Sequence, residues 1–221
     1  MGKLIHLIRR TEIADKTWAF EFSRPKSFNF KAGQNADFGV GDVRTFSIAS
    51  SPNNHETITI AARRLDPPNG RQVASDFKKL LMSMSIGEKI RIQGPFGDFT
   101  LPKKSDQPIV MLAGGIGITP FLSMIAYTTE EKLPHKITLF FGNSSPKRAT
   151  FSKELENFEK INPNFKCIFA YEHLTNKIIQ PKHDSRYFIA GPPGFVAGVR
   201  SILDEAGINE DTIRTEEFSG Y

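Results

Sequence analysis

The hydrophobic pattern of this chain changes at a polar segment bracketed by Pro102 and Pro108, and this change constrains the fold more than any other feature. Before the segment, short stretches alternate apolar and polar residues, as strands with one buried face do. After it, apolar runs such as residues 109–113 are continuous, which is typical of strands that a parallel sheet buries on both faces. The segment itself has the composition of a linker. We therefore expect two domains, residues 1–103 and residues 104–221.

The first half contains short segments of strand character separated by Gly, Pro or Asn, at the spacing of an antiparallel β-barrel. Apolar residues at helical spacing predict one helix among them, over residues 72–84. The start of that helix, Val73-Ala74-Ser75, would present free backbone N–H groups to a pyrophosphate, although an ordinary helix cap has the same pattern. The strand segments are residues 5–8, 17–22, 34–38, 44–48, 57–63 and 89–93.

The strand segment at residues 44–48 carries three side chains that suit one ligand. Arg44 is a cation that pairs with phosphate oxygens. Phe46 is a flat ring that stacks on a heterocycle, and Ser47 is a hydroxyl that hydrogen-bonds a ring nitrogen. Their order predicts a ligand with a phosphate at one end and a flat ring at the other. An edge strand with an exposed Arg shows the same pattern, so the segment alone does not decide between the two.

Strands and helices alternate after residue 108, which predicts an α/β nucleotide-binding domain built on a parallel sheet. Strands are expected at residues 109–113, 137–141, 166–170 and 186–190, and helices at residues 120–127, 151–160 and 195–206. Two glycine turns each follow a strand and precede a helix. The first runs from Gly114 to Pro120 and departs from the usual dinucleotide fingerprint, because Pro120 replaces its third small residue. The second is Gly191-Pro192-Pro193-Gly194. Two such turns at the ends of parallel strands predict a crevice for a ligand.

Composition excludes several classes of function. Cys167 is the only cysteine, so the chain has no internal disulfide and no metal site built from several thiolates. The five histidines show no metal-like spacing, and we expect no metal site. No apolar run approaches the ~20 residues of a membrane span, and the N-terminus has no signal-peptide pattern, so we expect a cytoplasmic protein. The net charge is +5, and no nucleic-acid motif accompanies it. Such a charge can steer anionic nucleotides or an acidic protein partner.

Taken together, Arg44-x-Phe46-Ser47, the turn from Gly114 to Pro120, and Gly191-Pro192-Pro193 resemble the motifs of the ferredoxin–NADP reductase superfamily in order and spacing. Gly33-Gln34 and Gly94-Pro95-x-Gly97-x-Phe99 add to the resemblance, which covers nearly the whole chain. It implies an N-terminal FAD-binding β-barrel of the reductase type and a C-terminal NAD(P)-binding α/β domain. It also implies an enzyme, an FAD-dependent NAD(P)H oxidoreductase. In such an enzyme hydride passes from C4 of NAD(P)H to N5 of the flavin, and the electrons then leave to a second acceptor.

The resemblance implies roles for individual residues. Arg44 would hold the flavin phosphates, Phe46 would stack on the isoalloxazine and Ser47 would reach its N5. The residues assigned to FAD are Arg44, Thr45, Phe46, Ser47, Ala61, Arg63, Val73, Ala74, Ser75, Thr119, Phe218 and Tyr221. The residues assigned to NAD(P) are Gly115, Gly117, Ile118, Thr119, Pro120, Asn143, Ser144, Lys147, Arg148, Gly191, Pro192 and Pro193. Catalytic roles are assigned to Ser47, Thr119, Glu216 and Tyr221.

The C-terminal segment ends in aromatic residues, whereas terminal tails are usually polar. In the family a C-terminal aromatic covers the flavin face that nicotinamide later occupies, and we assign this to Tyr221, with Phe218 as the second candidate. Glu216 or Glu217 would organise protons or nicotinamide near the flavin.

Four positions depart from the family pattern. Phe46 replaces a Tyr and so loses a hydroxyl. Ala190 stands where many members carry a Cys. Ala32 and Asn35 differ from the common Pro-Gly-Gln-aromatic run, so the contacts at the ring edge are left open.

The loop after the strand at 137–141 bears on the choice of nucleotide. It offers Asn143, Ser144, Lys147 and Arg148, but no Asp or Glu to accept a hydrogen bond from a ribose 2′-OH. Hydroxyl and cationic side chains suit a 2′-phosphate instead, although a plain surface loop has the same composition. We expect NADPH as the reductant, with NADH possible.

The electron acceptor is left open by the sequence. We expect an acidic electron carrier, such as a ferredoxin, a flavodoxin or an oxygenase component. One alternative is direct reduction of free flavin, quinone or ferric chelates. Another is a non-catalytic flavin- or nucleotide-binding subunit of a larger electron-transfer complex.

Overall fold

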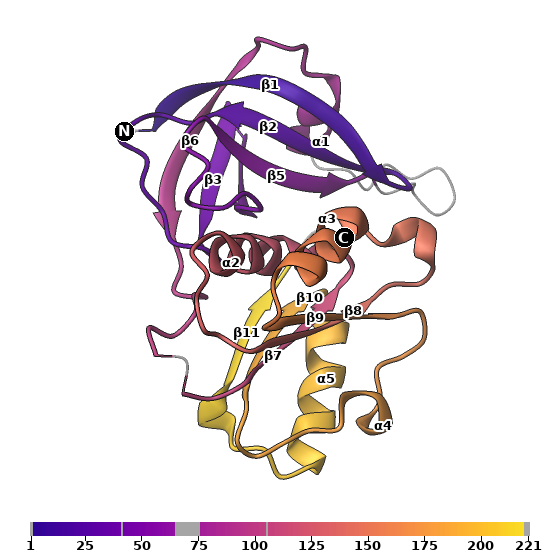
Figure 1. Cartoon of the computed structure of the whole chain (residues 1–221). Coiled ribbons are helices and arrows are strands. Elements are labelled where there is room, and N and C mark those ends of the chain that lie inside the picture. The colour runs from indigo at the N-terminus through magenta and orange to yellow at the C-terminus, as the bar shows by residue number, and fades with distance from the viewer. Residues whose placement is uncertain (1, 41, 65–75, 105, 219–221) are drawn as a thin grey trace, which may run out of the picture.

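The computed structural model describes residues 2–40, 42–64, 76–104 and 106–218. Within these residues, the first half forms a six-stranded antiparallel sheet and the second half a five-stranded parallel sheet with helices on both faces. The curled antiparallel sheet sits at one end of the molecule, and α2 (Ile118–Glu130) lies between it and the parallel sheet (Figure 1). The predicted fold class is therefore confirmed.

The antiparallel sheet has the strand order β4-β3-β6-β1-β2-β5 and curls into a barrel. Just beyond its outer strands, the backbone N–H of Ala49 donates to the carbonyl of Thr59 at 2.8 Å, which draws the two edges together. Phe20, Phe22 and Phe38 are fully buried inside. The strands are β1 (Lys3–Ala14), β2 (Thr17–Ser23), β3 (Asn35–Val40), β4 (Asp42–Ser47), β5 (Thr57–Arg63) and β6 (Lys89–Phe96).

A helix packs against the barrel core. It is α1 (Asp76–Ser83), and it buries Phe77 and Leu81 against the apolar residues of the strands. The predicted helix began earlier, at residue 72. Its proposed pyrophosphate-binding start, Val73-Ala74-Ser75, lies outside the residues that the structure describes.

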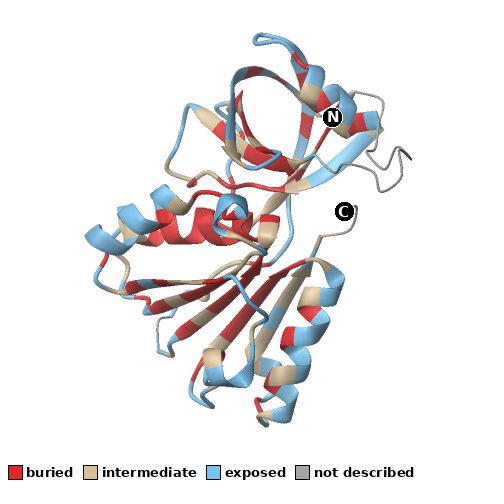
Figure 2. Ribbon diagram, turned by 90° about the vertical axis from the view of Figure 1, so that its right-hand side faces the viewer, coloured by how far each residue is buried: buried red, intermediate tan, exposed pale blue. Residues whose placement is uncertain are grey.

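The parallel sheet has the order β11-β10-β7-β8-β9, and side chains from each strand alternate between its two faces. Met111 of β7 faces α2 and α3 (Ser152–Ile161), whereas Leu112 faces α5 (Pro193–Glu205) and the short α4 (Asn176–Ile179). Figure 2 shows these strands and α2 largely buried, while the outer side of α5 is exposed. The strands are β7 (Ile109–Gly114), β8 (Ile137–Gly142), β9 (Phe165–Ala170), β10 (Arg186–Gly191) and β11 (Ile213–Glu217).

The strand β11 was not expected from the sequence, which suggested a terminal tail instead. β11 pairs in parallel with β10, and Glu216 lies opposite Ala190. Its residues, Ile-Arg-Thr-Glu-Glu, lack the continuous apolar run of the other four strands because an edge strand is partly exposed. The pattern used to find buried strands therefore could not find this one.

Cys167 lies in β9 and is buried. Burial, with Glu159 and Glu156 nearby, raises the pKa of this thiol to about 12. The thiol is thus protonated at neutral pH and packs as an apolar side chain.

The structure also bears on membranes and metals. No helix within the described ranges is long and apolar enough to cross a membrane. Among the same residues, no group of three or more His, Cys, Asp or Glu side chains is arranged to hold a metal ion.

The barrel and the parallel sheet share one apolar cluster at their junction. Ala19, Ala49 and Ala61 of the barrel pack in the same cluster as Phe121 and Leu122 of α2. Polar contacts surround it. Oγ of Ser123 donates to the carbonyl of Ser50 at 2.7 Å, and Nδ2 of Asn53 donates to Oε1 of Glu131, also at 2.7 Å. The backbone N–H of Asp15 donates to the carbonyl of Lys147 at 2.9 Å. The ends of the strands in both units are therefore held at a common junction.

Candidate functional site

The strand order of the parallel sheet reverses between β7 and β10, and the two glycine turns follow these neighbouring strands. In open α/β sheets, ligands bind at the carboxyl ends of the strands at this point. The turns touch closely: a Cβ atom at Gly117 would lie 2.2 Å from the carbonyl oxygen of Ala190. Only glycine fits at position 117. The short helix at Gly115–Gly117 leads directly into α2, so backbone N–H groups at a helix start lie beside the crevice.

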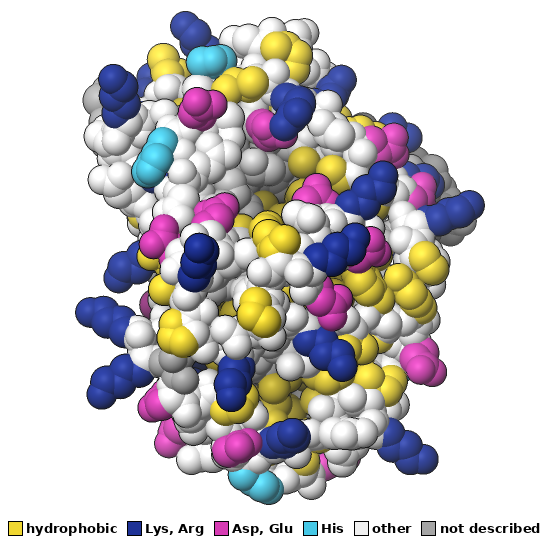
Figure 3. All heavy atoms as spheres, in the orientation of Figure 1, with side chains coloured by type: hydrophobic (Ala, Val, Ile, Leu, Met, Phe, Trp, Pro, Cys, Tyr) yellow, Lys and Arg dark blue, Asp and Glu magenta, His cyan; other side chains and the backbone are white. Residues whose placement is uncertain are grey.

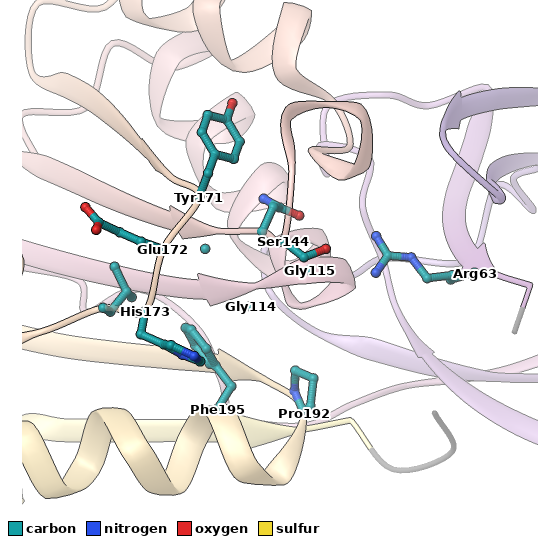
Figure 4. A pocket seen from close by; sticks show the side chains of 12 residues that line it. Arg63, Gly114, Gly115, Ser144, Tyr171, Glu172, His173, Pro192 and Phe195 are labelled. Carbon is teal, nitrogen blue, oxygen red and sulfur yellow. The ribbon is translucent and has the colours of Figure 1, made fainter. Parts of the chain in front are cut away.

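A cavity of about 490 Å³ opens beside these turns (Figure 4). This volume lies in the range of small-molecule sites. The residues that line it come from the barrel and from the carboxyl ends of β7, β8, β9 and β10. They are Arg63, Gly114, Gly115, Gly142, Asn143, Ser144, Tyr171, Glu172, His173, Leu174, Pro192 and Phe195.

Arg63 reaches the cavity from the barrel side. Its Nε donates to Oγ1 of the buried Thr17 at 3.1 Å, and its Nη2 donates to the carbonyl of Arg148 at 3.2 Å. Its Nη1 would lie 3.5 Å from a Cβ at Gly115. The resemblance assigned Arg63 to FAD. The structure places its guanidinium across the domain junction, beside the first glycine turn, where it can meet an anion in the nucleotide crevice.

Glycines form the inner wall of the cavity, and because they have no side chains the Phe195 ring can pack against them. A Cβ at Gly114 would lie 2.7 Å from Cγ of the Phe195 ring, and one at Gly142 would lie 3.3 Å from Cε2 of the same ring. Asn143, next along the chain, has a buried side-chain amide with no hydrogen-bond partner among the described residues. The cavity thus offers space for a ligand, the Asn143 amide, which can form hydrogen bonds, and the Arg63 guanidinium. Together these features fit a phosphate-bearing nucleotide.

The strand β4 reaches the same junction through Ser47. Ser47 is buried, and its Oγ donates to Oε2 of Glu216 at 3.3 Å. Nδ2 of Asn35 donates to the other carboxylate oxygen, Oε1, at 3.2 Å. Glu216 lies opposite Ala190, one residue before the second glycine turn. The predicted flavin strand and the predicted nucleotide crevice therefore meet at the carboxyl group of Glu216.

Burial raises the pKa of Glu216, and the hydrogen bonds from Asn35 and Ser47 partly oppose the shift. Burial acts in this direction because a carboxylate loses hydration inside a protein, whereas donors to its oxygens favour the charged form. Glu216 can therefore take up and release a proton closer to neutral pH than an ordinary glutamate.

The remaining flavin-assigned residues of β4 lie at its exposed end and against the barrel core. Nη1 of Arg44 donates to Oδ1 of Asp42 at 2.8 Å, and Arg44 is exposed. Oγ1 of Thr45 donates to Oδ1 of Asp37 at 2.6 Å.

Phe46 is partly buried. Its ring centroid lies 6.0 Å from that of Phe38 and 5.7 Å from that of Phe77. Neither Arg44 nor Phe46 is among the described residues that line the 490 Å³ cavity. Of β4, Ser47 makes the connection to the α/β half.

Several assigned residues are interior. Ile118 of the first glycine turn and Ala61 of β5 belong to the apolar cluster at the junction, and Pro120 is buried in α2. The buried Thr119 donates from Oγ1 to the carbonyl of Ile116 at 3.1 Å, so its hydroxyl holds the turn together.

Lys147, Arg148, Pro193 and Phe218 are not among the described residues that line the cavity. Lys147 and Arg148 are exposed in a short 3₁₀ helix, and Nη1 of Arg148 is 3.5 Å from Oγ of Ser144. Pro193 is the first residue of α5, directly after Pro192. The backbone N–H of Phe218 donates to the carbonyl of Gly191 at 3.0 Å, which ties the end of the described chain to the second glycine turn. Tyr221 lies outside the described residues.

The part of the cavity wall that follows β9 was not predicted from the sequence. Tyr171, Glu172 and His173 line the cavity, and the Tyr171 ring stacks on Phe169 with centroids 6.5 Å apart. The strand before them was predicted. The rule that ligands meet the carboxyl ends of parallel strands would have found these residues, had it been applied to this strand as well as to the glycine turns.

Comparisons with known proteins agree with this geometry. Residues 111–177 match the family model of the oxidoreductase NAD-binding domain. The chain is 28% identical over 201 residues to one subunit of the Na(+)-translocating NADH-quinone reductase of Pseudoalteromonas atlantica, a match that covers 80% of this chain and 49% of that protein. The chain thus spans about half the length of the curated relatives it matches.

Solved structures share the fold over nearly the whole chain. The flavohem-like FAD/NAD-binding domain of nitric oxide dioxygenase from Vibrio cholerae superposes with a TM-score of 0.84 at 20% identity, covering 98% of each chain. The ferredoxin-NADP+ reductase of Plasmodium falciparum gives a TM-score of 0.82 at 17% identity, covering 98% of this chain and 96% of that one.

Proposed function

We propose that this chain belongs to the ferredoxin–NADP reductase superfamily and is a flavin-dependent NAD(P)H oxidoreductase that binds FAD along β4 and the nicotinamide nucleotide in the crevice of the parallel sheet. The observation that carries the proposal is the contact between Ser47 and Glu216. It joins the strand with the flavin motif to the strand beside the second glycine turn. Two cofactors held on either side of this contact would meet at the junction.

The residues of the chain would divide the work between binding and orientation. Arg44 would hold a phosphate of FAD, and Phe46 would provide an apolar ring against the flavin. Arg63 and the N–H groups of the first glycine turn would bind the pyrophosphate of the nucleotide. When bound, FAD would supply the redox chemistry, which is uptake of a hydride from the nicotinamide and release of electrons to an acceptor. Holding both rings in contact removes most of the entropic cost of their meeting.

At the junction, Ser47 and Glu216 would hold a proton close to the flavin site. A partly buried carboxyl with a raised pKa exchanges a proton more readily near neutral pH than an exposed one. Ser47 donates to this carboxyl and lies at the end of β4, so it connects Glu216 to the strand that carries the flavin motif.

NADPH is the proposed reductant. Ser144 lines the cavity, Arg148 contacts its hydroxyl, and Lys147 precedes Arg148 in the same 3₁₀ helix. A hydroxyl and cations suit a 2′-phosphate. Glu172 lines the same cavity and would repel that phosphate.

We therefore expect Arg148→Gln to raise the KM for NADPH about tenfold with little effect on NADH, since a hydrogen bond to a charged group contributes ~1.5–3 kcal/mol. Glu172→Gln should lower the KM for NADPH. Steady-state kinetics with both nucleotides measures this. A wild-type preference for NADH, or equal effects of Arg148→Gln on the two nucleotides, would contradict the assignment.

The electrons are proposed to leave to a separate acidic carrier, such as a ferredoxin, a flavodoxin or an oxygenase component. The net charge of +5 supports an anionic partner. On the face seen in Figure 3, Lys and Arg are interspersed with Asp and Glu around the hollow between the two halves. The described residues form no continuous basic patch on that face, so the docking surface is expected elsewhere.

An acceptor screen tests the proposed function. The purified chain is reconstituted with FAD, and NADPH oxidation is followed with ferricyanide, acidic carriers, free flavin, quinone or ferric chelate as acceptor. Fast reduction of an acidic carrier that falls steeply with salt supports the proposal. If only free flavin, quinone or ferric chelate is reduced, one of these, and not an acidic carrier, is the acceptor. Failure to bind FAD, or no NADPH oxidation with any acceptor, would overturn the proposed enzyme.

A further inference from the structure

Asn35 and Ser47 each donate a hydrogen bond to a different oxygen of one carboxyl group. They are direct partners in the register of β3 and β4, so both stand on the same side of the sheet. Nδ2 of Asn35 donates to Oε1 of Glu216 at 3.2 Å, and Oγ of Ser47 donates to Oε2 at 3.3 Å. The barrel thus holds the last strand of the α/β half through two bonds to a single side chain.

The amide of Asn35 is closely confined. Asn35 pairs with Ser47 on one side and with Phe96, the last residue of β6, on the other. A Cβ at Gly97 would lie 3.0 Å from Nδ2 of Asn35, so the chain after β6 presses against the amide. Nε2 of Gln34 donates to the carbonyl of Gly97 at 3.0 Å and fixes that stretch in place. The neighbouring backbone therefore holds the amide of Asn35 in position beside Glu216.

The two donors have a chemical property in common: each can also accept. A hydroxyl donates one hydrogen bond and accepts others, and an amide presents N–H on one side and C=O on the other. When Glu216 is ionised, both partners donate to it. When Glu216 carries a proton, the amide can turn its oxygen towards the carboxyl O–H. A hydrocarbon at position 35 would leave a carboxyl oxygen without a partner, at the cost of a buried unsatisfied group.

We propose that Asn35 is a positioning residue for Glu216, keeping this carboxyl group hydrogen-bonded at the domain junction in both of its protonation states. The proposal rests on the proposed function, in which Glu216 holds a proton beside the flavin site. It gives a use to a residue that stands where the family pattern has an aromatic ring. Asn35 acts through Glu216 and not on a cofactor.

The charged groups on the surrounding strands are paired with other residues, exposed, or distant from Glu216. On β3, Asp37 accepts from Thr45, and on β4, Asp42 pairs with Arg44. On β11 itself, Arg214 and Glu217 are exposed, and on β10, Arg186 lies at the opposite end of the strand from Ala190, the register partner of Glu216. Burial sets the direction in which the pKa of Glu216 is raised, and the hydrogen bonds from Asn35 and Ser47 oppose it.

The test is a titration of the Glu216 carboxyl carbon by NMR in the purified chain without cofactors. Asn35→Leu removes a donor to the charged form, so the protonated fraction of Glu216 at neutral pH should rise several-fold. Asn35→Asp keeps the shape and places a second carboxyl beside the first, so it should raise that fraction further. If Asn35→Leu fails to fold, Asn35→Asp still decides.

The chain offers a matched control. Nδ2 of Asn53 donates to Oε1 of Glu131 at 2.7 Å, which is also an amide-to-carboxylate bond between the two halves. Asn53→Leu loosens the junction in the same way but should leave the titration of Glu216 unchanged. The proposal would be overturned if Asn35→Leu and Asn35→Asp left the titration of Glu216 unchanged. It would also be overturned if Asn53→Leu shifted this titration as much as the Asn35 variants do.

A second readout separates this proposal from the proposed function. In FAD-loaded protein, the pH profile of kcat/KM for NADPH should move with the NMR titration in the Asn35 variants and stay in place in Asn53→Leu. If the titration moves but the chain oxidises no NADPH with any acceptor, the positioning by Asn35 stands and the proposed function fails. If NADPH is oxidised but neither the titration nor the profile moves, the enzyme stands and the role of Asn35 fails.

Discussion

The two sides of the domain junction are built in opposite ways. The barrel contributes polar side chains: the guanidinium of Arg63, the hydroxyl of Ser47 and the amide of Asn35. The parallel sheet contributes small residues, with Gly114 and Gly117 packed where no Cβ fits. The barrel side of the site makes hydrogen bonds, and the glycine turns of the parallel sheet make room.

The two sides therefore differ in the substitutions that they tolerate. A polar side chain that loses one bond leaves its neighbours in place, so a substitution on the barrel side should change affinity more than folding. A glycine in contact with backbone has no slack, so an added methyl group must push the two turns apart. Glu216 and the cavity-lining Asn143, Ser144 and Glu172 are exceptions, because they are polar side chains supplied by the α/β half. Three substitutions test these statements, in order of expected effect.

The largest effect is expected at Gly117. Gly117→Ala would place a Cβ 2.2 Å from the carbonyl oxygen of Ala190 and 2.7 Å from Cα of Gly191. We expect a loss of about 3 kcal/mol in the free energy of unfolding, at the upper end of typical overpacking costs. Urea unfolding measures this. Gly198→Ala is the control, since Gly198 lies inside α5 with open space around it and should gain about 1 kcal/mol from better helix propensity. Equal stability of Gly117→Ala and the wild type would break the comparison.

A smaller effect is expected at Arg63. Arg63→Gln removes the cation that the barrel places at the mouth of the cavity. The KM for NADPH should rise about tenfold with kcat nearly unchanged, because hydrogen bonds to charged groups contribute ~1.5–3 kcal/mol to binding. Arg64→Gln, one residue along and exposed, is the matched control and should leave both constants in place. A change in FAD affinity in place of a change in the KM for NADPH would indicate that Arg63 belongs to the flavin site.

The smallest effect is expected from Glu216→Gln, and it depends on pH. The raised pKa means that the folded chain binds this proton more tightly than the unfolded chain does. The stability supplied by Glu216 is therefore greatest below its usual pKa and is lost as pH rises through the raised one. Gln removes the charge, keeps one acceptor oxygen and places an NH2 where the other oxygen stood, from which the Ser47 hydroxyl or the Asn35 carbonyl can accept. The variant should therefore be more stable than the wild type at neutral pH and less dependent on pH. Urea unfolding at several pH values checks this, and identical pH dependence would contradict it.

The sequence predicted the elements whose pattern depends on local rules. The barrel strands, the four buried strands of the parallel sheet and both glycine turns follow from hydrophobic period and turn residues. β11 did not follow, because a partly exposed edge strand has no apolar run.

The individual site contacts were less accessible from the sequence. Ser47 and Glu216 are 169 positions apart, and only the packing of the two halves brings them together. The same is true of Arg63, whose neighbours at the cavity come from the far half of the chain. Tyr171 and Glu172 were within reach of the strand-end rule, but no glycine marks their position.

The most direct test of a shared junction is a single-turnover reduction without oxygen. FAD-loaded protein is mixed rapidly with NADPH, and the flavin absorbance is followed in the wild type, in Arg63→Gln and in Arg64→Gln. The account predicts fast bleaching in the wild type and in Arg64→Gln, and bleaching in Arg63→Gln that requires about tenfold more NADPH to reach the same rate. Bound FAD that NADPH fails to bleach in the wild type would contradict a junction at which the two cofactors meet.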